Sequence, residues 1–244
     1  MLAFRLLRHS ILQLTGNLGA ALTLSVQPLL IAALGIGIGL AARQVFIGGD
    51  APGIAVAAVT IAMAATFVLA FVSLAASWHR FILLDERPRV LRPIGRPELR
   101  YATASVKLAL LLMLPGLMFV LLGQTLMIAL GGGIGLYFVI FMMSGFVLAV
   151  FGLRLGIGLA GAATGAERPM TTGWHAGGSH LGVLIVLVLF VQILTMAVNL
   201  LLSLPLAGLA ELLASLLFGW FNTLLWLSLI STLWGHFVEG RDLR

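Results

Sequence analysis

Long apolar runs separated by short charged segments dominate this chain of 244 residues. A helix that crosses a bilayer needs about 20 mostly apolar residues, and six of the runs reach that length. The apolar residues are continuous and do not alternate at period two, which favours helices over strands. We predict an all-α, polytopic transmembrane helical bundle with about six spans. The spans are expected at residues 17–41, 53–77, 105–130, 134–157, 181–205 and 209–234.

The first fifteen residues have a different, amphipathic pattern. Arg5, Arg8 and His9 recur at helical spacing, and leucines and an isoleucine occupy the opposite face. This arrangement is typical of an interfacial helix that lies on the cytoplasmic leaflet with its basic side toward anionic headgroups. A simple extension of the first span is the alternative. We therefore expect an interfacial amphipathic helix at 1–15 and a single six-helix membrane domain at 16–244.

The distribution of basic residues predicts the orientation. Lys and Arg number two in the N-terminal segment, one in the first loop, seven in the second, none in the third, two in the fourth, none in the fifth and two in the tail. The positive-inside rule assigns the basic segments to the cytoplasmic side. Both termini are therefore expected in the cytoplasm, with the protein a multi-pass chain of a bacterial inner membrane.

Composition supports a membrane location and excludes several kinds of chemistry. Apolar residues make up 61% of the chain and charged residues 9%, with a mean hydropathy of +1.15. The absence of cysteine rules out disulfides and thiolate metal sites. The net charge of +6 follows from basic cytoplasmic loops, so no nucleic-acid partner is expected. No Ser-His-Asp set, carboxylate cluster or phosphate loop is found, and we expect no enzymatic activity, catalytic residue, cofactor or metal.

The segment from residue 78 to 104 carries most of the polar chemistry and is predicted to be a basic cytoplasmic loop. Its three prolines disfavour a helix, so the loop is expected to be partly extended. The Trp and His at its start suit the aromatic belt at headgroup level. Each basic residue near a membrane surface attracts anionic lipid by about 1 kcal/mol. The candidate docking residues for a partner or for anionic lipid are Trp78, His79, Arg80, Arg87, Arg89, Arg92, Arg96 and Arg100.

Small residues recur at helical spacing within two of the predicted spans. Gly35 and Gly39 form one small-xxx-small pair, and Gly152 and Gly156 form another. Such pairs let helix backbones approach closely, either within one chain or between partners. We predict helix packing at these four glycines and leave both kinds of contact open.

Three of the predicted spans end alike on the cytoplasmic side. Each is followed by a Glu with an Arg close behind it, as Glu86-Arg87, Glu167-Arg168 and Glu239-Gly240-Arg241. The likeness suggests three helical hairpins in series, related as parallel repeats are. Coincidence at interfaces that are rich in charge is the alternative.

Two patches resemble sequences of a known family. The stretch Trp78-His79-Arg80-Phe81-Ile82-Leu83-Leu84-Asp85-Glu86-Arg87-Pro88 resembles a cytoplasmic-edge motif of bacterial six-helix inner-membrane proteins, which are similar to the membrane domain found next to glycerophosphodiester phosphodiesterases. The stretch from Arg154-Leu155 through Ala162-Ala163 to Thr171-Thr172-Gly173-Trp174 is similar to the matching turn in such proteins. The resemblance implies a fold and an inner-membrane address. It implies no phosphodiesterase activity, because neither patch carries catalytic chemistry.

The prediction of function rests on the absence of charged residues from the centres of the predicted spans. No ionisable residue lies near the centre of a predicted span, which argues against ion-coupled transport. We predict a non-catalytic accessory, assembly or scaffold subunit of a larger membrane complex, with membrane lipids and other membrane protein subunits as partners. A lipid or small-solute permease without ion coupling, using Gln124, Gln192 and Asn199 around a cavity, is the alternative. Anionic-lipid sensing by residues 1–15 and 78–100 is a third hypothesis.

Overall fold

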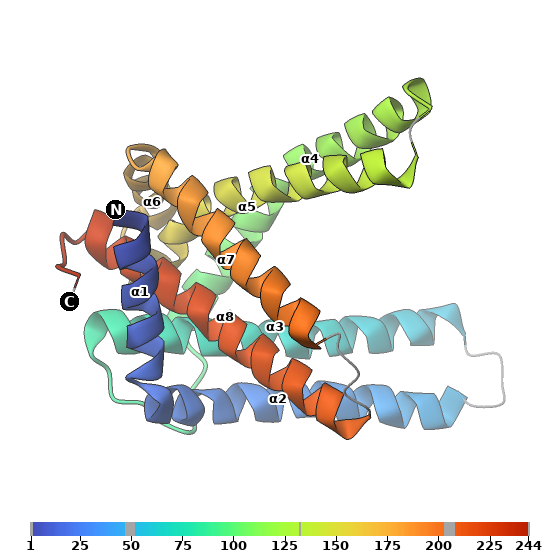
Figure 1. The fold of residues 1–244 in the computed structure, drawn as a ribbon. Coiled ribbons are helices and arrows are strands. Elements are labelled where there is room, and N and C mark those ends of the chain that lie inside the picture. Colours follow the sequence, from blue (N-terminus) through green and yellow to red (C-terminus); the bar gives the residue numbers. More distant parts are fainter. Residues whose placement is uncertain (1, 47–51, 132, 203–207, 244) are drawn as a thin grey trace.

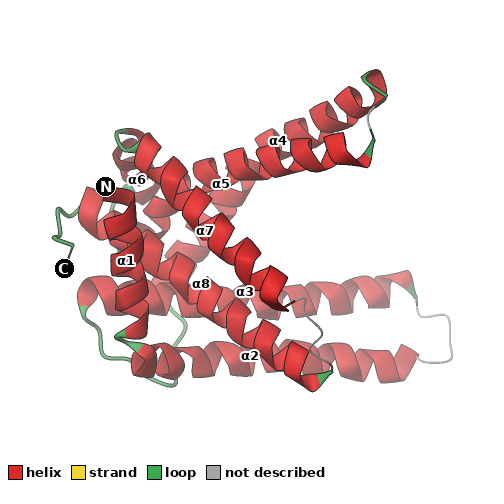
Figure 2. Cartoon of the chain, in the orientation of Figure 1, coloured by secondary structure: helices red, strands yellow, loops and turns green. Residues whose placement is uncertain are grey.

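The computed structural model describes residues 2–46, 52–131, 133–202 and 208–243, and every regular element within these ranges is a helix (Figure 1, Figure 2). The helices are α1 (Leu2–Thr15), α2 (Leu18–Phe46), α3 (Gly53–Leu84), α4 (Arg96–Ala129), α5 (Ile134–Thr164), α6 (Pro169–Gly178), α7 (Leu181–Leu202) and α8 (Leu209–Phe237). All of them except α1 and α6 are long and apolar enough to cross a membrane. The predicted all-α, multi-pass bundle with six spans is therefore confirmed.

The N-terminal residues form a helix of their own. A turn at Gly16 and Asn17 separates α1 from α2. The side chain of Asn17 donates to the backbone oxygen of Gln13 at 2.7 Å, which satisfies one of the carbonyl groups that the last turn of α1 leaves open. α1 lies across α7 and α8 (Figure 1), with Leu6 and Leu14 fully buried. The predicted N-terminal helix is confirmed, and the alternative of an extended first span is wrong.

Two long helical hairpins, α2–α3 and α4–α5, leave a common core and diverge (Figure 1). α8 lies among the other helices and packs mainly against α1, α3 and α5, while α7 packs mainly against α5 and α1. The predicted series of hairpins therefore holds for the first two pairs of spans. The third pair differs, because α7 and α8 contact each other little and each packs mainly against other helices.

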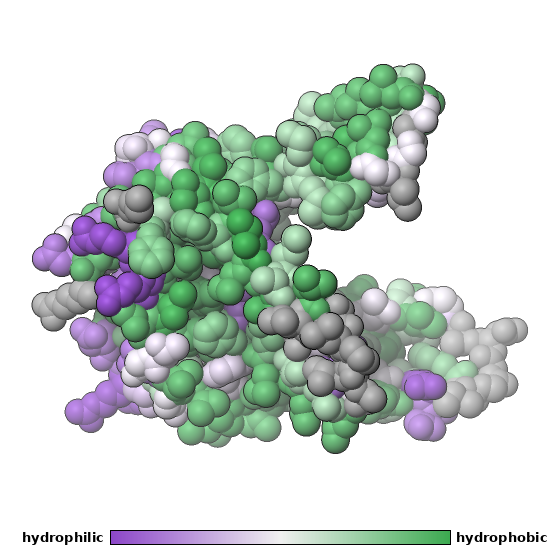
Figure 3. Space-filling view, in the orientation of Figure 1, coloured by the Kyte–Doolittle hydropathy of each residue, from purple (hydrophilic) through white to green (hydrophobic). Residues whose placement is uncertain are grey.

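The buried core lies at one end of the molecule. In α3 the buried residues fall between Ala70 and Leu83, and in α8 between Leu224 and Gly235. The most apolar window of α3 is only 6% buried, as is that of α4, whereas that of α8 is 28% buried. The outer halves of the two hairpins therefore expose apolar side chains (Figure 3), as expected for surfaces that face lipid or a partner within a membrane.

The helices around the predicted basic loop are longer than expected. α3 continues to Leu84 and α4 starts at Arg96, so the segment between them is 85–95 and not the predicted 78–104. Pro97 lies in the first turn of α4, where the missing N–H costs nothing. This proline therefore starts a helix, although it was expected to prevent one.

The connection between α5 and α7, predicted to be a loop, contains α6, which packs along α5. A Cβ atom added to Gly173 of α6 would lie 2.5 Å from the backbone nitrogen of Gly158. A Cβ atom on Gly158 would lie 2.6 Å from the backbone oxygen of Pro169. Only glycine allows backbones to come this close, so Gly158 and Gly173 make a tight contact between α5 and α6.

Candidate functional site

Charged and polar residues gather at one end of the protein, which we call the basic end. α3, α5 and α8 finish there, and α2, α4 and α7 begin there, so the segment 85–95, α6 and both termini lie together (Figure 1). Hydrophilic residues are concentrated on this side in Figure 3. The eight predicted docking residues all belong to this end, but their side chains have different surroundings.

Trp78 and His79 are buried in the core, which corrects the prediction of a headgroup-level position for them. Neither residue exposes any surface. The indole Nε1 of Trp78 donates to Ser228 Oγ at 3.0 Å, and His79 Nδ1 lies 2.8 Å from Ser231 Oγ. The reason is that α3 continues as a helix beyond the predicted span and packs this turn against α8.

The hydrogen bonds around His79 indicate its tautomer. The one hydroxyl proton of Ser231 is donated to the backbone oxygen of Leu227, with Oγ at 2.9 Å from that oxygen. Ser231 Oγ therefore accepts a hydrogen bond from the protonated Nδ1 of His79. Nε2 is then an acceptor, and it has no hydrogen-bond partner within the part of the chain that the structure describes. The ring of Tyr101 lies 5.6 Å from the imidazole ring, centroid to centroid. His79 is thus enclosed by core side chains and is not accessible to a partner.

Arg80 joins the end of α3 to the end of α5. Its guanidinium forms an ion pair with Glu86, with Nε 2.9 Å from Glu86 Oε2. Nη1 also donates to the backbone oxygen of Ala163 at 3.2 Å. This bond satisfies one of the carbonyl groups that the last turn of α5 leaves open. Each of the three guanidinium nitrogens of Arg80 thus donates a hydrogen bond within the chain.

Arg92 holds the segment 85–95 against α3 and α4. Its Nη2 lies 3.2 Å from Glu98 Oε1 and also donates to Ser77 Oγ. The side chain of Arg92 is 16% exposed and that of Glu98 is 6% exposed, so this is a largely buried ion pair. Glu98 Oε2 in turn accepts from the Gly95 N–H at 2.9 Å at the start of α4. The guanidinium of Arg92 is therefore used to stabilise the fold and is not exposed to a docking partner.

Arg87, Arg89 and Arg96 remain exposed, and they form no ion pair within the described ranges. We call these three residues the arginine patch. Arg87 and Arg89 line a cavity of about 540 Å³ next to the ion pairs of Arg80 and Arg92. The arginine patch is the part of the predicted docking set whose guanidinium groups are open to a partner on this side.

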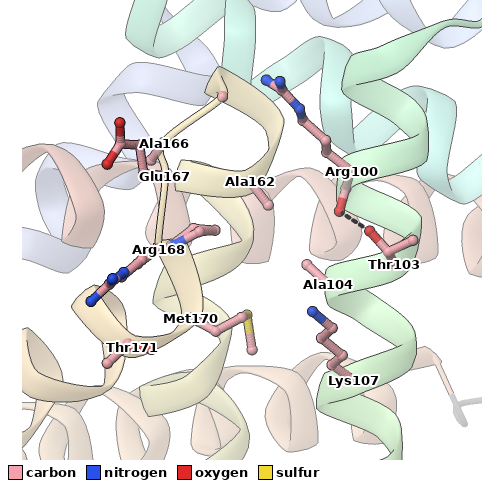
Figure 4. Close-up of a pocket in the computed structure, with 12 residues that line it drawn as sticks. Arg100, Thr103, Ala104, Lys107, Ala162, Ala166, Glu167, Arg168, Met170 and Thr171 are labelled. Carbon is pink, nitrogen blue, oxygen red and sulfur yellow. Dashed lines mark hydrogen bonds between the residues drawn. The ribbon is translucent and has the colours of Figure 1, made fainter.

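Arg100 belongs to a second groove, which lies between α4 and the α5–α6 turn (Figure 4). This groove, which we call the α4–α6 groove, has a volume of about 640 Å³. Arg100, Thr103 and Lys107 line it from α4, and the side chain of Lys107 extends toward the opposite wall. Glu167 and Arg168 lie at the rim on the α5–α6 side, and both side chains point away from α4. The single predicted docking region thus divides into two separate surfaces.

An apolar groove lies further along α4, between α4 and α5. Its volume is about 450 Å³, and Trp174 of α6 forms part of its wall. Trp174 is held by Arg154, whose Nε donates to the Trp174 backbone oxygen at 3.0 Å and whose guanidinium carbon lies 3.5 Å from the centre of the indole ring. The ring of Phe151 stacks on Trp174 at 6.3 Å. Arg154 thus anchors α6 to α5 and shapes this groove.

Gly35 and Gly39 lie against α3, inside the α2–α3 hairpin. A Cβ atom on Gly39 would lie 2.7 Å from the sulfur of Met63, and one on Gly35 would collide with Thr66. Both glycines therefore face a helix of the same chain.

Gly152 and Gly156 have more room than their spacing suggests. A Cβ atom would lie 3.4 Å from Leu112 at the first glycine and 3.8 Å from Ile230 at the second, which are ordinary contact distances. The tight glycines of α5 are instead Gly158 and Gly161, where an added Cβ would meet backbone of α6 and the Trp234 ring.

The polar face of α8 was missed by the sequence reasoning. Ser228, Ser231 and Thr232 are three and four residues apart, so they share one helix face. Besides the bonds to Trp78 and His79, this face accepts a hydrogen bond from Ser10 of α1 to Thr232 at 3.1 Å. Three hydroxyl groups at helical spacing within an apolar span are a signal that could have indicated it.

The described residues contain no group of three or more His, Asp or Glu side chains that could hold a metal ion. Compared with known proteins, the chain matches no family model, no curated protein and no solved structure. The fold and the site define a class, a multi-pass helical membrane protein with a basic end and two diverging hairpins. The resemblance to the membrane domain found next to glycerophosphodiester phosphodiesterases stays a prediction.

Proposed function

We propose that this protein is a non-catalytic accessory, assembly or scaffold subunit of a larger membrane complex. The observation that carries the proposal is the divergence of α2–α3 from α4–α5, which leaves apolar side chains exposed along both outer halves (Figure 3). Helices in a membrane associate through close packing, and a transmembrane segment of a partner between the hairpins would supply the contacts that they do not make with each other.

The proposed location is a bacterial inner membrane with both termini in the cytoplasm. The collection of basic segments at one end of the bundle supports this orientation, because positively charged loops are retained on the cytoplasmic side. The arginine patch would then face the cytoplasm, where it can bind acidic side chains of the same partner.

The use of the polar side chains favours association over catalysis or transport. Trp78, His79 and Arg92 form hydrogen bonds with other side chains of the same chain. Gln124 lines a groove between α4 and α5, whereas Asn199 is exposed on α7 and bonds its own helix. Gln124 and Asn199 are thus in different surroundings, and the groove lined by Gln124 is not lined by Gln192 or Asn199.

Purification of the tagged protein from its native membrane in mild detergent, followed by mass spectrometry, tests the proposal. We expect a stoichiometric membrane-protein partner, lost from a variant with Arg87, Arg89 and Arg96 all replaced by Gln. The matched control replaces the exposed Arg5, Arg8 and Arg43 by Gln, removes the same charge and should retain the partner.

Photocrosslinking locates the partner. Ile61 of α3 and Met143 of α5, 68% and 65% exposed, are replaced by a photoreactive residue, with Phe4 of α1, 57% exposed, as the control. Adducts with one polypeptide from both hairpins, and none from position 4, are the expected result. Recovery of the protein alone, with adducts to lipid only, would count against an accessory role.

A lipid or small-solute permease is the second candidate, and one observation favours it. The groove lined by Gln124, Tyr137 and Ser144, with a volume of about 280 Å³, extends the two grooves along α4 and α5 toward the far ends of these helices. Transport into vesicles by the purified protein, without any partner, would support this candidate over the accessory subunit.

A further inference from the structure

We propose that the α4–α6 groove and the apolar groove further along α4 together bind one anionic glycerophospholipid, with the phosphate between Arg100 and Lys107 and an acyl chain between α4 and α5. This site lies on a different surface from the arginine patch. It does not depend on an accessory role for the protein.

The basic part of the site is built on one face of α4. Arg100, Thr103 and Lys107 are three and four residues apart, so their side chains point the same way. At 1.5 Å per residue, Arg100 and Lys107 are separated by about 10 Å along the helix, and Lys107 lies at the start of the span expected from the sequence, at 105–130. Neither side chain forms an ion pair within the described residues.

An ammonium group within a membrane helix is costly unless it has a partner. Lys107 extends from α4 toward the opposite wall of the groove (Figure 4). Arg100 lies against the end of α5, where its Nη1 would be 2.7 Å from a Cβ atom on Gly165. The two cations thus flank an open space of about 640 Å³, with Thr103 between them on the same wall. The hydroxyl of Thr103 donates to the backbone oxygens of Leu99 and Arg100 in its own helix, so the cationic groups are left to bind a ligand. An anionic oxygen group in this space would provide the missing partner for Lys107.

The same face of α4 becomes apolar beyond Lys107. Leu111, Pro115 and Phe119 follow at intervals of four residues and line the apolar groove of about 450 Å³. Phe151 and Leu155 of α5 line it from the other side. Along α4, cationic side chains at the basic end are followed by an apolar groove. A phospholipid has the same arrangement, because its charged headgroup lies at the interface and its acyl chains lie in the hydrocarbon region. A soluble phosphate would use only the first half of this surface.

The charges also select the kind of headgroup. Arg100 and Lys107 are the charged side chains on the α4 wall of the groove, whereas Glu167 and Arg168 at the rim point away from it and carry opposite charges. A surplus of cationic side chains favours an anionic headgroup such as phosphatidylglycerol over a zwitterionic one such as phosphatidylcholine.

Native mass spectrometry of the full-length protein in mild detergent, titrated with each lipid, tests the site. We expect phosphatidylglycerol to bind with one-to-one stoichiometry and more tightly than phosphatidylcholine. Replacing Arg100 and Lys107 together by Gln should weaken that binding by about thirtyfold, since two basic contacts are lost. The matched control, Arg87 and Arg89 replaced by Gln, should leave it unchanged.

A second variant and a second ligand keep the result decisive. Thr103→Trp fills the groove but retains its charges, and it should also abolish one-to-one binding, which covers the case in which the double variant does not fold. Glycerol phosphate, which carries no acyl chain, should not compete. Equal weakening in the control, equal binding of phosphatidylcholine, or full competition by glycerol phosphate would each overturn the proposal.

Discussion

Gln27 and Arg92, which are 65 residues apart in the chain, exchange two hydrogen bonds. The side-chain amide of Gln27 donates to the backbone oxygen of Arg92 at 2.9 Å, and its oxygen accepts from the Arg92 N–H at 2.9 Å. Gln27 therefore binds the backbone of the segment 85–95 much as a neighbouring strand would. Gln27, an uncharged polar residue in an apolar helix, thus adds to the contacts of Arg92 with Ser77 and Glu98 that hold the connection between α3 and α4.

Replacing Arg92 by Gln should destabilise the protein strongly. The change leaves the carboxylate of Glu98 buried without its cation, and the loss of one partner of a buried ion pair costs about 3–5 kcal/mol. Thermal unfolding in detergent measures the effect, with Arg89→Gln, an exposed position three residues away, as the control. Equal unfolding temperatures for the two variants would show that the Arg92–Glu98 pair does not stabilise the fold.

Substitutions of Trp78 and Ser228 should be energetically coupled, because the two side chains share a hydrogen bond. Trp78→Phe removes the indole donor and Ser228→Ala removes its acceptor, so each variant should lose about 1–3 kcal/mol. The double variant should lose less than the sum of the two, by about 0.5 kcal/mol or more, as contacting residues do. A double-mutant cycle by chemical unfolding gives this coupling energy. Additive losses would mean that the two side chains act independently.

Glycine substitutions should discriminate between the tight and the open positions of α5. Gly158→Ala places a methyl group against the backbone of α6 and should destabilise by about 1–3 kcal/mol, the usual cost of overpacking. Gly152→Ala and Gly145→Ala should be near neutral or slightly stabilising, because their added Cβ atoms meet ordinary contacts or open space. Comparison of unfolding temperatures for the three variants checks this order, and a stable Gly158→Ala protein would contradict it.

The absence of cysteine makes the proposed orientation directly measurable. Leu91→Cys lies in the segment 85–95 and Leu130→Cys at the far end of α4, and the two leucines are 67% and 66% exposed. A maleimide that cannot cross membranes should label Leu130→Cys in intact spheroplasts. Leu91→Cys should react only after lysis. The opposite pattern would invert the topology.

Hydropathy was sufficient for the number and order of the spans, but not for where the helices end. Hydropathy detects apolar residues only, and both α3 and α4 continue as helices through polar sequence at the basic end. Trp78 and His79 illustrate the limit. An aromatic residue beside a histidine at the end of a span is typical of the interface, yet their hydrogen-bond partners on α8 lie 150 and 152 residues away. Local sequence does not contain such long-range pairs.

The charged residues divide in the same way. The exposure of the arginine patch could be predicted from the sequence, because a charged side chain in water needs no partner from elsewhere in the chain. The pairing of Arg92 with Glu98 and the separation of Arg100 into another groove depend on how α4 begins, and that start was expected to be loop. Similarly, glycine spacing indicated close packing in α5, but which glycines are tight depends on α6, a helix that the hydropathy pattern did not predict.

The hydrogen bond from Ser10 to Thr232 joins residues 222 positions apart, and it has a consequence for how the chain is made. The hairpins α2–α3 and α4–α5 can form from neighbouring sequence as soon as they leave the ribosome, whereas α1 must wait until α8 has been synthesised and inserted. A nascent chain that ends before α8 leaves α1 without its main packing partner, and only the contacts of α1 with α7 and α2 can form. An incompletely packed α1 is therefore a mark by which quality-control proteases could distinguish an unfinished molecule from a completed one.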